Sequence, residues 1–318
     1  MGWTIKTWCL QKIKNMKNLY IQCIVFLAVL SIFSCKEDKK ENEKTPGPAN
    51  TSVIKKAGDA NLNISFLLDL SDRIDPKKYP NKSMEFYERD VAYIKSVSEA
   101  FDTHMRNKKV REMNDQIQVF FDPEPQNNNV NAISRNLKFL INRQNASLEL
   151  LDEIKNTYAS KPLEIYDLAI NDNNFIGSDT WRFFKDKVKD YSIEEDHRNI
   201  LVIFTDGYIY HENTKMKEGN KTSYITPQVI RNYGLNTKAW QEKMDKNEYG
   251  YIPATTNLHN LEVLVLGINP DPKNPYEKEV IMKYWTDWFE AMEVGRYEIK
   301  TADLPSDLDK IIKTFILK

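Results

Sequence analysis

Short apolar runs alternate along the chain with longer stretches in which apolar residues return every three or four positions. A continuous apolar run with polar flanks is typical of a strand buried on both faces, and the longer spacing is typical of an amphipathic helix. Four runs predict buried strands: Leu62–Asp69, Gln116–Pro123, Asn199–Gly207 and Asn260–Pro270. Helices are expected at Ser83–Met105, Leu148–Tyr158, Trp181–Tyr191, Tyr276–Val294 and Ser306–Lys318, with a short strand in 296–305.

The alternation of strands and helices predicts an α/β fold. Because each parallel crossover needs a covering helix, we expect a three-layer, doubly wound and mostly parallel sheet with helices on both faces. Residues 60–318 are enough for one such domain. The stretch at about 208–259 is roughly twice as long as an ordinary crossover, so it is predicted to be an insertion.

The N-terminal segment 1–34 is predicted to be a secretory signal and not part of the fold. Lysines precede an apolar run, Leu19–Phe33, that is shorter than a membrane-spanning helix requires. The following "IFSC" resembles the lipobox of bacterial lipoproteins of the Bacteroidetes type. This resemblance implies cleavage before Cys35 and its acylation, with palmitate among the acyl chains, and therefore a membrane anchor in the cell envelope.

Residues 35–59 are charged, contain Pro and Gly and carry almost no large apolar side chains. This composition predicts a disordered tether between the anchor and the domain. Lys36 stands where inner-membrane lipoproteins commonly carry an aspartate, which favours the outer membrane, with the domain facing the periplasm or the cell surface.

Cysteine content and charge narrow the function classes. No cysteine follows Cys35, so the mature chain has no disulfide and no thiolate metal site. The full chain has a formal charge of −1, and loss of the signal segment, with four lysines and no acid, brings it to −5. Because the balance is acidic and no basic stripe remains, a nucleic-acid partner is not expected.

Polar side chains directly follow two of the predicted strands. The first ends in "DLSDR", with Asp69, Ser71, Asp72 and Arg73, and a later one ends in "FTDG", with Asp206. Ligands of such sheets bind outside the carboxyl ends of the strands, so we expect Asp69 and Asp206 to meet there. Mg²⁺ prefers oxygen ligands and is usually held by one or two carboxylates. The residue types alone leave open whether this is a metal site, a catalytic site or only a loop.

These residues resemble the metal-ion-dependent adhesion site of the von Willebrand factor A domain. In that family the first strand ends in Asp-x-Ser-x-Ser and a later strand in Thr-Asp-Gly, which "DLSDR" and "FTDG" match in part. "EVLVLGIN" and "YEIKTADLPSDLDKIIKTF" resemble the family's later strands and last helix. The resemblance covers about Asn61 to Leu317, and it implies that Asp69 and Ser71 are first-loop ligands and Asp206 the third-loop carboxylate.

Two ligand positions depart from the family pattern. Arg73 stands in place of the second serine, and Leu163, in "SKPLEIYDLAI", stands in place of a threonine. Two versions of the site follow. In a metal-dependent version, an acidic group of the partner completes the shell of Mg²⁺. In a degenerate version, the Arg73 guanidinium replaces the cation, pairs with Asp69 or Asp206 and could receive the partner's acid directly.

The insertion adds a second indication of binding. It is rich in tyrosine interleaved with charges and starts directly after Asp206, so it is predicted to cover the same edge of the sheet. Aromatic side chains offer rigid contact area at a small entropic cost. We therefore expect a protein or glycan partner, bound through Arg73, Asp72, Tyr208 and Tyr210.

Two other functions stay open on sequence alone. A metal-assisted hydrolase of the phosphatase or esterase class would use Asp69 and Asp206, although the sequence singles out no catalytic residue and has no glycine-rich phosphate loop. A structural component of the envelope would carry the same residues as a vestigial site.

Overall fold

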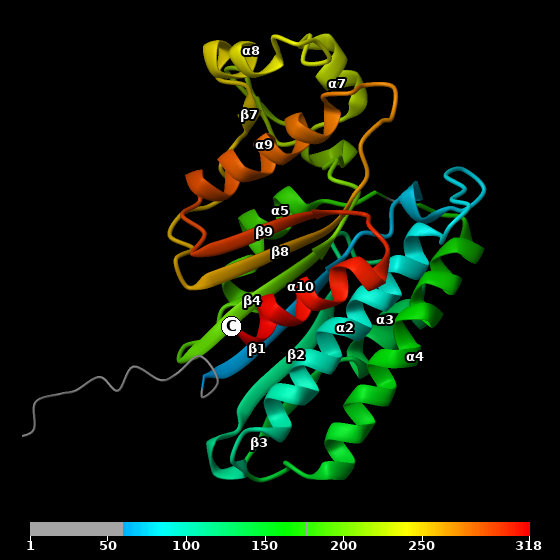
Figure 1. Cartoon of the computed structure of the whole chain (residues 1–318), viewed down its shortest axis with the longest axis vertical. Helices are drawn as coiled ribbons and strands as arrows, with labels where there is room; N and C mark the ends of the chain where they lie inside the picture. The colour runs from blue at the N-terminus through cyan, green and yellow to red at the C-terminus, as the bar shows by residue number, and fades with distance from the viewer. Residues whose placement is uncertain (1–59, 176) are drawn as a thin grey trace, which may run out of the picture. The chain divides into compact units, whose positions relative to one another are not determined.

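A mixed six-stranded sheet lies at the centre of the fold, with the order β3-β2-β1-β4-β8-β9 (Figure 1). Neighbouring strands are parallel, except that β2 and β3 are antiparallel. The fold class is therefore α/β. The strands are β1 (Asn61–Leu68), β2 (Asn114–Phe120), β3 (Phe139–Asn142), β4 (His197–Phe204), β8 (Leu261–Ile268) and β9 (Arg296–Thr301).

The structure is a computed structural model that describes residues 60–175 and 177–318. Every described residue belongs to one compact unit, which falls within Ile54–Lys318. Among the described residues, no helix is long and apolar enough to cross a membrane. Three predicted features lie outside the described residues: the signal segment 1–34, the acylated Cys35 and the tether 35–59.

Alternate residues of the central strands contribute to two separate hydrophobic clusters. In β4, Ile200 and Val202 belong to the first cluster, whereas Leu201 and Ile203 belong to the second. Because successive side chains of a strand point to opposite faces, the sheet has a hydrophobic core on each side. Burial on both faces explains the continuous apolar runs of the sequence.

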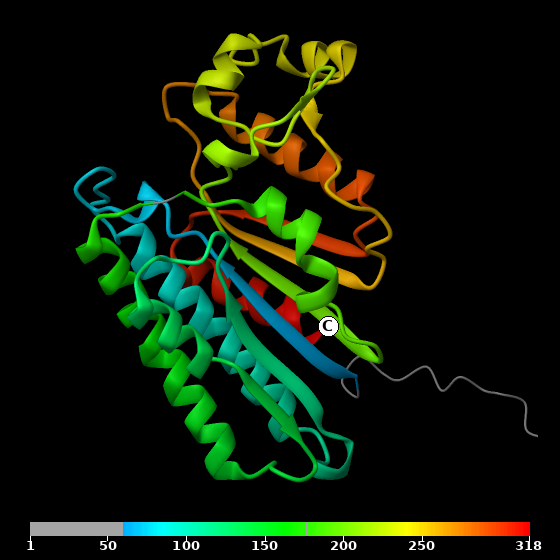
Figure 2. The same cartoon turned by 180° about the vertical axis from the view of Figure 1, so that it is seen from behind.

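Helices supply the rest of both clusters. Side chains of α2, α3, α4 and α10 complete the first cluster, and those of α5 to α9 complete the second. Figure 1 shows α2, α4 and α10 in front of the sheet, and Figure 2, seen from behind, shows α5 against the other face. The helices are α2 (Phe86–Arg106), α3 (Asn128–Asn136), α4 (Leu148–Asp172), α5 (Thr180–Asp186), α6 (Val188–Ser192), α7 (Pro227–Asn232), α8 (Trp240–Asn247), α9 (Glu277–Ala291) and α10 (Pro305–Leu317).

The segment predicted as an insertion contains α7, α8 and a small three-stranded sheet of order β5-β6-β7. Part of its aromatic content is structural. Tyr251 is 2% exposed, and its ring lies 5.2 Å from that of Trp288 in α9. The indole nitrogens of Trp181 and Trp288 both donate to the Ile252 carbonyl. The three short strands are β5 (Lys217–Glu218), β6 (Lys221–Thr222) and β7 (Gly250–Tyr251).

The four predicted buried strands are confirmed as β1, β2, β4 and β8. The prediction for the helix at Leu148–Tyr158 was too short, because α4 continues for 25 residues to Asp172. It runs through Pro162, which has no N–H to give to the helix but is itself buried. The sequence analysis also missed α3 and the antiparallel strand β3, which form from the asparagine-rich segment at 126–145.

Candidate functional site

The residues predicted to form a site come together at the carboxyl edge of the sheet. β1 and β4 are parallel neighbours with Leu68 paired to Phe204, and the Asp69 amide donates to the Phe204 carbonyl over 3.2 Å. Asp69 therefore follows β1 where Asp206 follows β4. Both side chains line one cavity, together with Ser71 and Asp72.

Each acidic loop is held by a short turn. Asp69 Oδ1 accepts a hydrogen bond from the Ser71 amide at 2.8 Å, and Asp206 Oδ1 accepts one from the Tyr208 amide at 3.0 Å. Gly207 lies between Asp206 and Tyr208 and has φ of +102°. A Cβ atom at this position would lie 2.7 Å from Ile281 Cγ2. Glycine is therefore required for the chain to leave β4 in this direction.

Arg73 lies buried among the acids and is 5% exposed. Its Nη2 donates to Asp90 Oδ2 at 2.5 Å, and its Nε lies 3.4 Å from Asp69 Oδ2. Burial alone would lower the pKa of Arg73, but the attraction of Asp90 and then Asp69 raises that pKa overall. The guanidinium therefore stays charged and forms an internal ion pair with carboxylates from β1 and α2.

The sequence analysis did not identify two residues that contact Arg73 or its partners, Asp90 and Tyr166. Asp90 lies on the buried side of α2, is 1% exposed, and accepts a hydrogen bond from the Tyr166 hydroxyl at 3.0 Å. Burial raises the pKa of Asp90, and the Arg73 charge opposes that rise. An available signal was the position of Asp90 in the apolar stripe of its helix, three and four residues before Tyr93 and Ile94.

Leu163 does not belong to the site. The resemblance placed it in a loop at the threonine position, but it lies inside α4 and is 41% exposed. Because α4 is continuous here, there is no loop at this position. The same helix instead brings Tyr166 to Asp90, so a phenol hydroxyl and not a threonine reaches the cluster.

Asp206 lies closest to solvent among the three acids around Arg73, since it is part-exposed whereas Asp69 and Asp90 are buried. Burial, and then the charge of Asp69, raise the pKa of Asp206 to about 7. Among the described residues, the only hydrogen bond to its carboxyl group is the one from the Tyr208 amide to Oδ1. The second oxygen is therefore available to a ligand.

Two cavities meet at Asp206 and Tyr208, which line both. The larger, of about 500 Å³, is here called the proline-walled cavity. The smaller, of about 320 Å³, is here called the acidic cleft. Besides Asp206 and Tyr208, the proline-walled cavity is lined mainly by Pro227, Pro270, Pro272, Tyr79, Phe86 and Arg73. The acidic cleft is lined mainly by Asp69, Ser71, Asp72, Glu212, Tyr210 and His211.

Besides Arg73, three residues were predicted to bind a partner: Tyr208, Tyr210 and Asp72. They differ in how firmly other side chains hold them. The Tyr208 hydroxyl is fixed, because it donates to Glu277 Oε1 at 2.8 Å and accepts from the Asp271 amide at 3.1 Å. Tyr210 is 40% exposed and forms an edge-to-face pair with Tyr224. Asp72 forms an exposed ion pair with Lys78. Tyr210 is therefore the aromatic side chain most accessible from the cleft.

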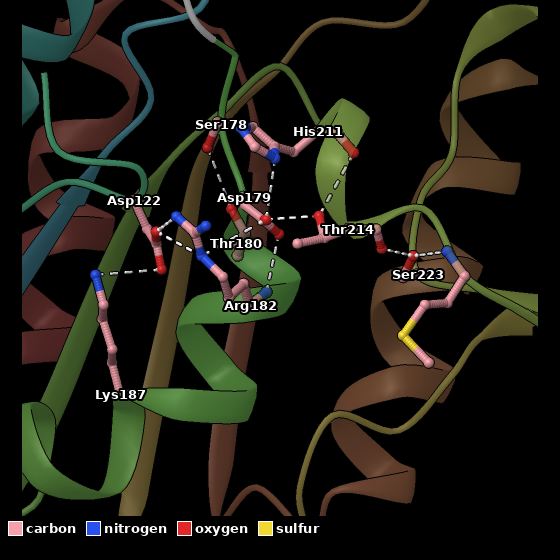
Figure 3. A network of polar contacts seen from close by, with 10 residues as sticks. Asp122, Ser178, Asp179, Thr180, Arg182, Lys187, His211, Thr214 and Ser223 are labelled. Carbon is pink, nitrogen blue, oxygen red and sulfur yellow. Dashed lines mark hydrogen bonds and ion pairs between the residues drawn. The ribbon is translucent and has the colours of Figure 1, made fainter. Parts of the chain in front are cut away.

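A second polar network adjoins the acidic cleft and includes His211 and Ser178 from its lining (Figure 3). Arg182 Nε donates to Asp122 Oδ1 at 3.0 Å, and the Asp179 amide donates to the Asp122 carbonyl at 2.7 Å. Asp179 Oδ2 accepts from Thr214 Oγ1 at 2.6 Å and lies 3.5 Å from His211 Nδ1. The network ties the loop after β2 to the start of the insertion, which fixes the segment that carries Tyr210.

Of the three predicted metal ligands, Asp69 is already engaged in other contacts through both carboxylate oxygens. Asp69 Oδ1 accepts from the Ser71 amide, and Asp69 Oδ2 faces Arg73. Among the described residues, no group of three or more His, Cys, Asp or Glu side chains is arranged to hold a metal ion. A positive charge already lies among the acids, so the residues fit an internal ion pair better than a divalent cation.

No protein-family model and no curated protein matches this sequence. Among solved structures, the chain is similar to the pilus adhesin SpaC from Lactobacillus rhamnosus GG in its open conformation, with 12% sequence identity and a TM-score of 0.37. That match covers 81% of this chain and 30% of the adhesin chain.

Proposed function

We propose that the described unit is a doubly wound, mostly parallel domain of the von Willebrand factor A type with an altered adhesion site. Four of the five strand pairs in the six-stranded sheet are parallel, and a hydrophobic core lies on each face of this sheet. The acids follow β1 and β4 at the carboxyl edge, where ligands of such sheets bind. These observations support the family assignment that the two motifs suggest.

The function we propose is binding of a partner through this edge, without a metal ion. The observation that carries the proposal is the position of Arg73, buried against Asp69 and Asp90. An internal guanidinium holds the two carboxylates in place as a divalent cation would, while Asp206, Tyr208 and Tyr210 stay at the surface of two cavities. A preorganised polar centre with aromatic neighbours is typical of a recognition site.

Site-specific photo-crosslinking tests this function. A photoreactive phenylalanine analogue at position 210 should give a discrete crosslinked product in living cells, because Tyr210 is exposed at the acidic cleft. Tyr191 is a matched control, since it is 51% exposed and lines neither cavity at Asp206. Equal crosslinking at both positions, or none at 210, would contradict binding through this edge and leave a structural component with a vestigial site.

We further propose that the protein is a lipoprotein of the cell envelope, anchored in the outer membrane through Cys35 after loss of residues 1–34. The proposal rests on the sequence of this segment, in which a short apolar run ends at "IFSC". Labelled palmitate should be incorporated into the wild-type chain and not into Cys35→Ala. Label retained in the variant would show that acylation occurs elsewhere.

A hydrolase remains the second candidate. Asp206 has a pKa of about 7, suited to proton transfer at neutral pH, and lines two cavities. His211, with Nδ1 3.5 Å from Asp179, lines one of them. This candidate predicts turnover of p-nitrophenyl phosphate or p-nitrophenyl acetate that Asp206→Asn abolishes. Turnover that persists in the variant, or no turnover in the wild type, would exclude this role for Asp206.

A further inference from the structure

The carboxyl edge of the sheet holds more negative than positive charge. Asp69, Asp90 and Asp206 surround one guanidinium, that of Arg73. Arg73 is bound directly to Asp90 and faces Asp69, so its charge is already committed to two buried acids. A third negative charge appears when Asp206 ionises, and among the described residues no basic side chain forms an ion pair with it.

The proline-walled cavity gives access to this carboxyl group. Its volume of about 500 Å³ is in the range of a ligand pocket. Its walls carry the rings of Tyr79, Phe86 and Tyr208 and the three prolines, which suit the methylene stem of a long side chain. The aromatic faces also favour a cation over an anion.

Two further charged residues of the cavity lining, Arg231 and Asp271, neutralise each other. Arg231 Nη1 lies 3.3 Å from Asp271 Oδ2, and both residues line the cavity. Because these two side chains are paired, neither Arg231 nor Asp271 is left as an unpaired charge for a ligand. Asp206, which also lines the acidic cleft, is therefore the charged group of this cavity that selects between a cationic and an anionic ligand.

We propose that the proline-walled cavity receives a basic side chain, lysine or arginine, of a protein partner, with its cationic end at Asp206. The inference rests on the proposed binding function and reverses the polarity that the metal-site resemblance implies. A metal centre takes an acid from its partner, whereas a centre with an internal guanidinium and a surplus of carboxylates takes a base. It also favours a protein over a neutral or acidic glycan, which offers no cation.

Small probes test the proposal directly on the full chain in detergent. Nα-acetyl-arginine amide and Nα-acetyl-lysine amide should bind, measured by calorimetry or ligand-observed NMR, while Nα-acetyl-glutamate amide should not.

Two variants separate a local contact from general charge attraction. Asp206→Asn should reduce the affinity for the arginine probe at least tenfold at pH 8. Glu242→Gln removes the same charge from exposed α8, which lines neither cavity, and should leave the affinity unchanged. Circular dichroism checks that both variants fold.

Binding of the glutamate probe, or equal affinity of the arginine probe for Asp206→Asn and the wild type, would overturn the inference. If crosslinking at position 210 persists while the cationic probes fail to bind, the partner-binding function stands and only the basic side chain is excluded. If the crosslink itself is absent, the proposed function fails independently of the probes.

Discussion

Two buried ionic clusters lie at opposite edges of the same sheet, and they are built differently. At the amino edge, one acid, Asp115, accepts hydrogen bonds from Lys108 Nζ at 2.7 Å and from the Leu62 amide at 2.7 Å, and lies 3.3 Å from His104 Nε2. At the carboxyl edge, one base, Arg73, serves two buried acids, and a third acid, Asp206, lies beside them.

The difference is visible in the direction of the pKa shifts. Burial pushes the pKa of Asp115 up, but hydrogen bonds from His104 and Lys108 outweigh it and lower that pKa overall. At the carboxyl edge, burial prevails and raises the pKa of both Asp90 and Asp206. At the amino edge the hydrogen bonds and positive charges compensate the buried carboxylate, which stabilises the fold. At the carboxyl edge the carboxyl groups outnumber the positive charges, an imbalance that is common at binding sites.

The largest effect is expected from loss of the single base. Arg73→Met should cost roughly 3–5 kcal/mol in the free energy of unfolding, because it leaves Asp69 and Asp90 buried without a cation. Urea unfolding at pH 7.5 measures it. Lys108→Met should cost less, roughly 1–3 kcal/mol, because Asp115 keeps its other donors.

A double variant provides the control for this comparison. Adding Asp90→Asn to Arg73→Met removes one of the stranded charges and should recover a large part of the lost stability. A cost below about 1 kcal/mol for Arg73→Met alone would mean that the guanidinium is not the partner on which the buried acids depend.

The pH dependence of stability should have opposite signs at the two edges. A carboxyl group with a raised pKa binds its proton more tightly in the folded state, so ionisation of Asp206 costs stability as the pH rises from about 4 to about 7. Asp206→Asn should therefore be more stable than the wild type at pH 8, by roughly 1–3 kcal/mol, and nearly equal to it at pH 4.5.

Asp115 gives the opposite result. Its pKa is lowered in the folded state, so its contribution is present above its ordinary pKa and is lost as the pH falls through the folded value. Asp115→Asn should therefore be less stable than the wild type at pH 8, with a smaller difference in acid. Unfolding curves at pH 3, 4.5, 6 and 8 provide both results, and a shared sign for the two variants at pH 8 would remove the distinction between the edges.

A further effect concerns the hydroxyl that contacts Asp90. Tyr166→Phe removes a hydrogen bond to a charged acceptor and should cost roughly 1.5–3 kcal/mol. Tyr158→Phe is matched, since Tyr158 is equally buried in α4 but donates to the neutral Leu137 carbonyl, and it should cost roughly 1 kcal/mol. Equal costs in urea unfolding would indicate that Asp90 carries no charge in the folded protein.

Much of the fold could be predicted from the sequence because it depends on local patterns. The apolar runs of β1 and β4 identify strands buried on both faces, and the parallel order then brings Asp69 and Asp206 to one edge. The path of α4 could not be predicted in the same way. The resemblance of "SKPLEIYDLAI" to a loop motif suggested an interruption, but packing of Ile165 and Tyr166 into the core keeps the helix continuous.

The partners of Arg73 depended on contacts that are distant in sequence. The sequence offered Asp69 or Asp206 as its partner, and the structure gives Asp69 together with Asp90, 17 positions away in α2. An acid on an apolar helical stripe indicates that a buried base exists, but not which one. Likewise, the tyrosines of the insertion look alike in sequence, yet Tyr251 is buried and Tyr210 is exposed.

The most direct test of the account is a titration of the full chain with Mg²⁺ or Mn²⁺ while the midpoint of thermal unfolding is followed. A cation that binds only the folded state raises this midpoint, and the rise continues with the logarithm of the metal concentration above Kd. With Arg73 already among the acids, we expect no change in the midpoint at millimolar metal. A rise that increases with metal concentration and disappears in Asp69→Ala would show that a metal ion and not the Arg73 guanidinium organises the site.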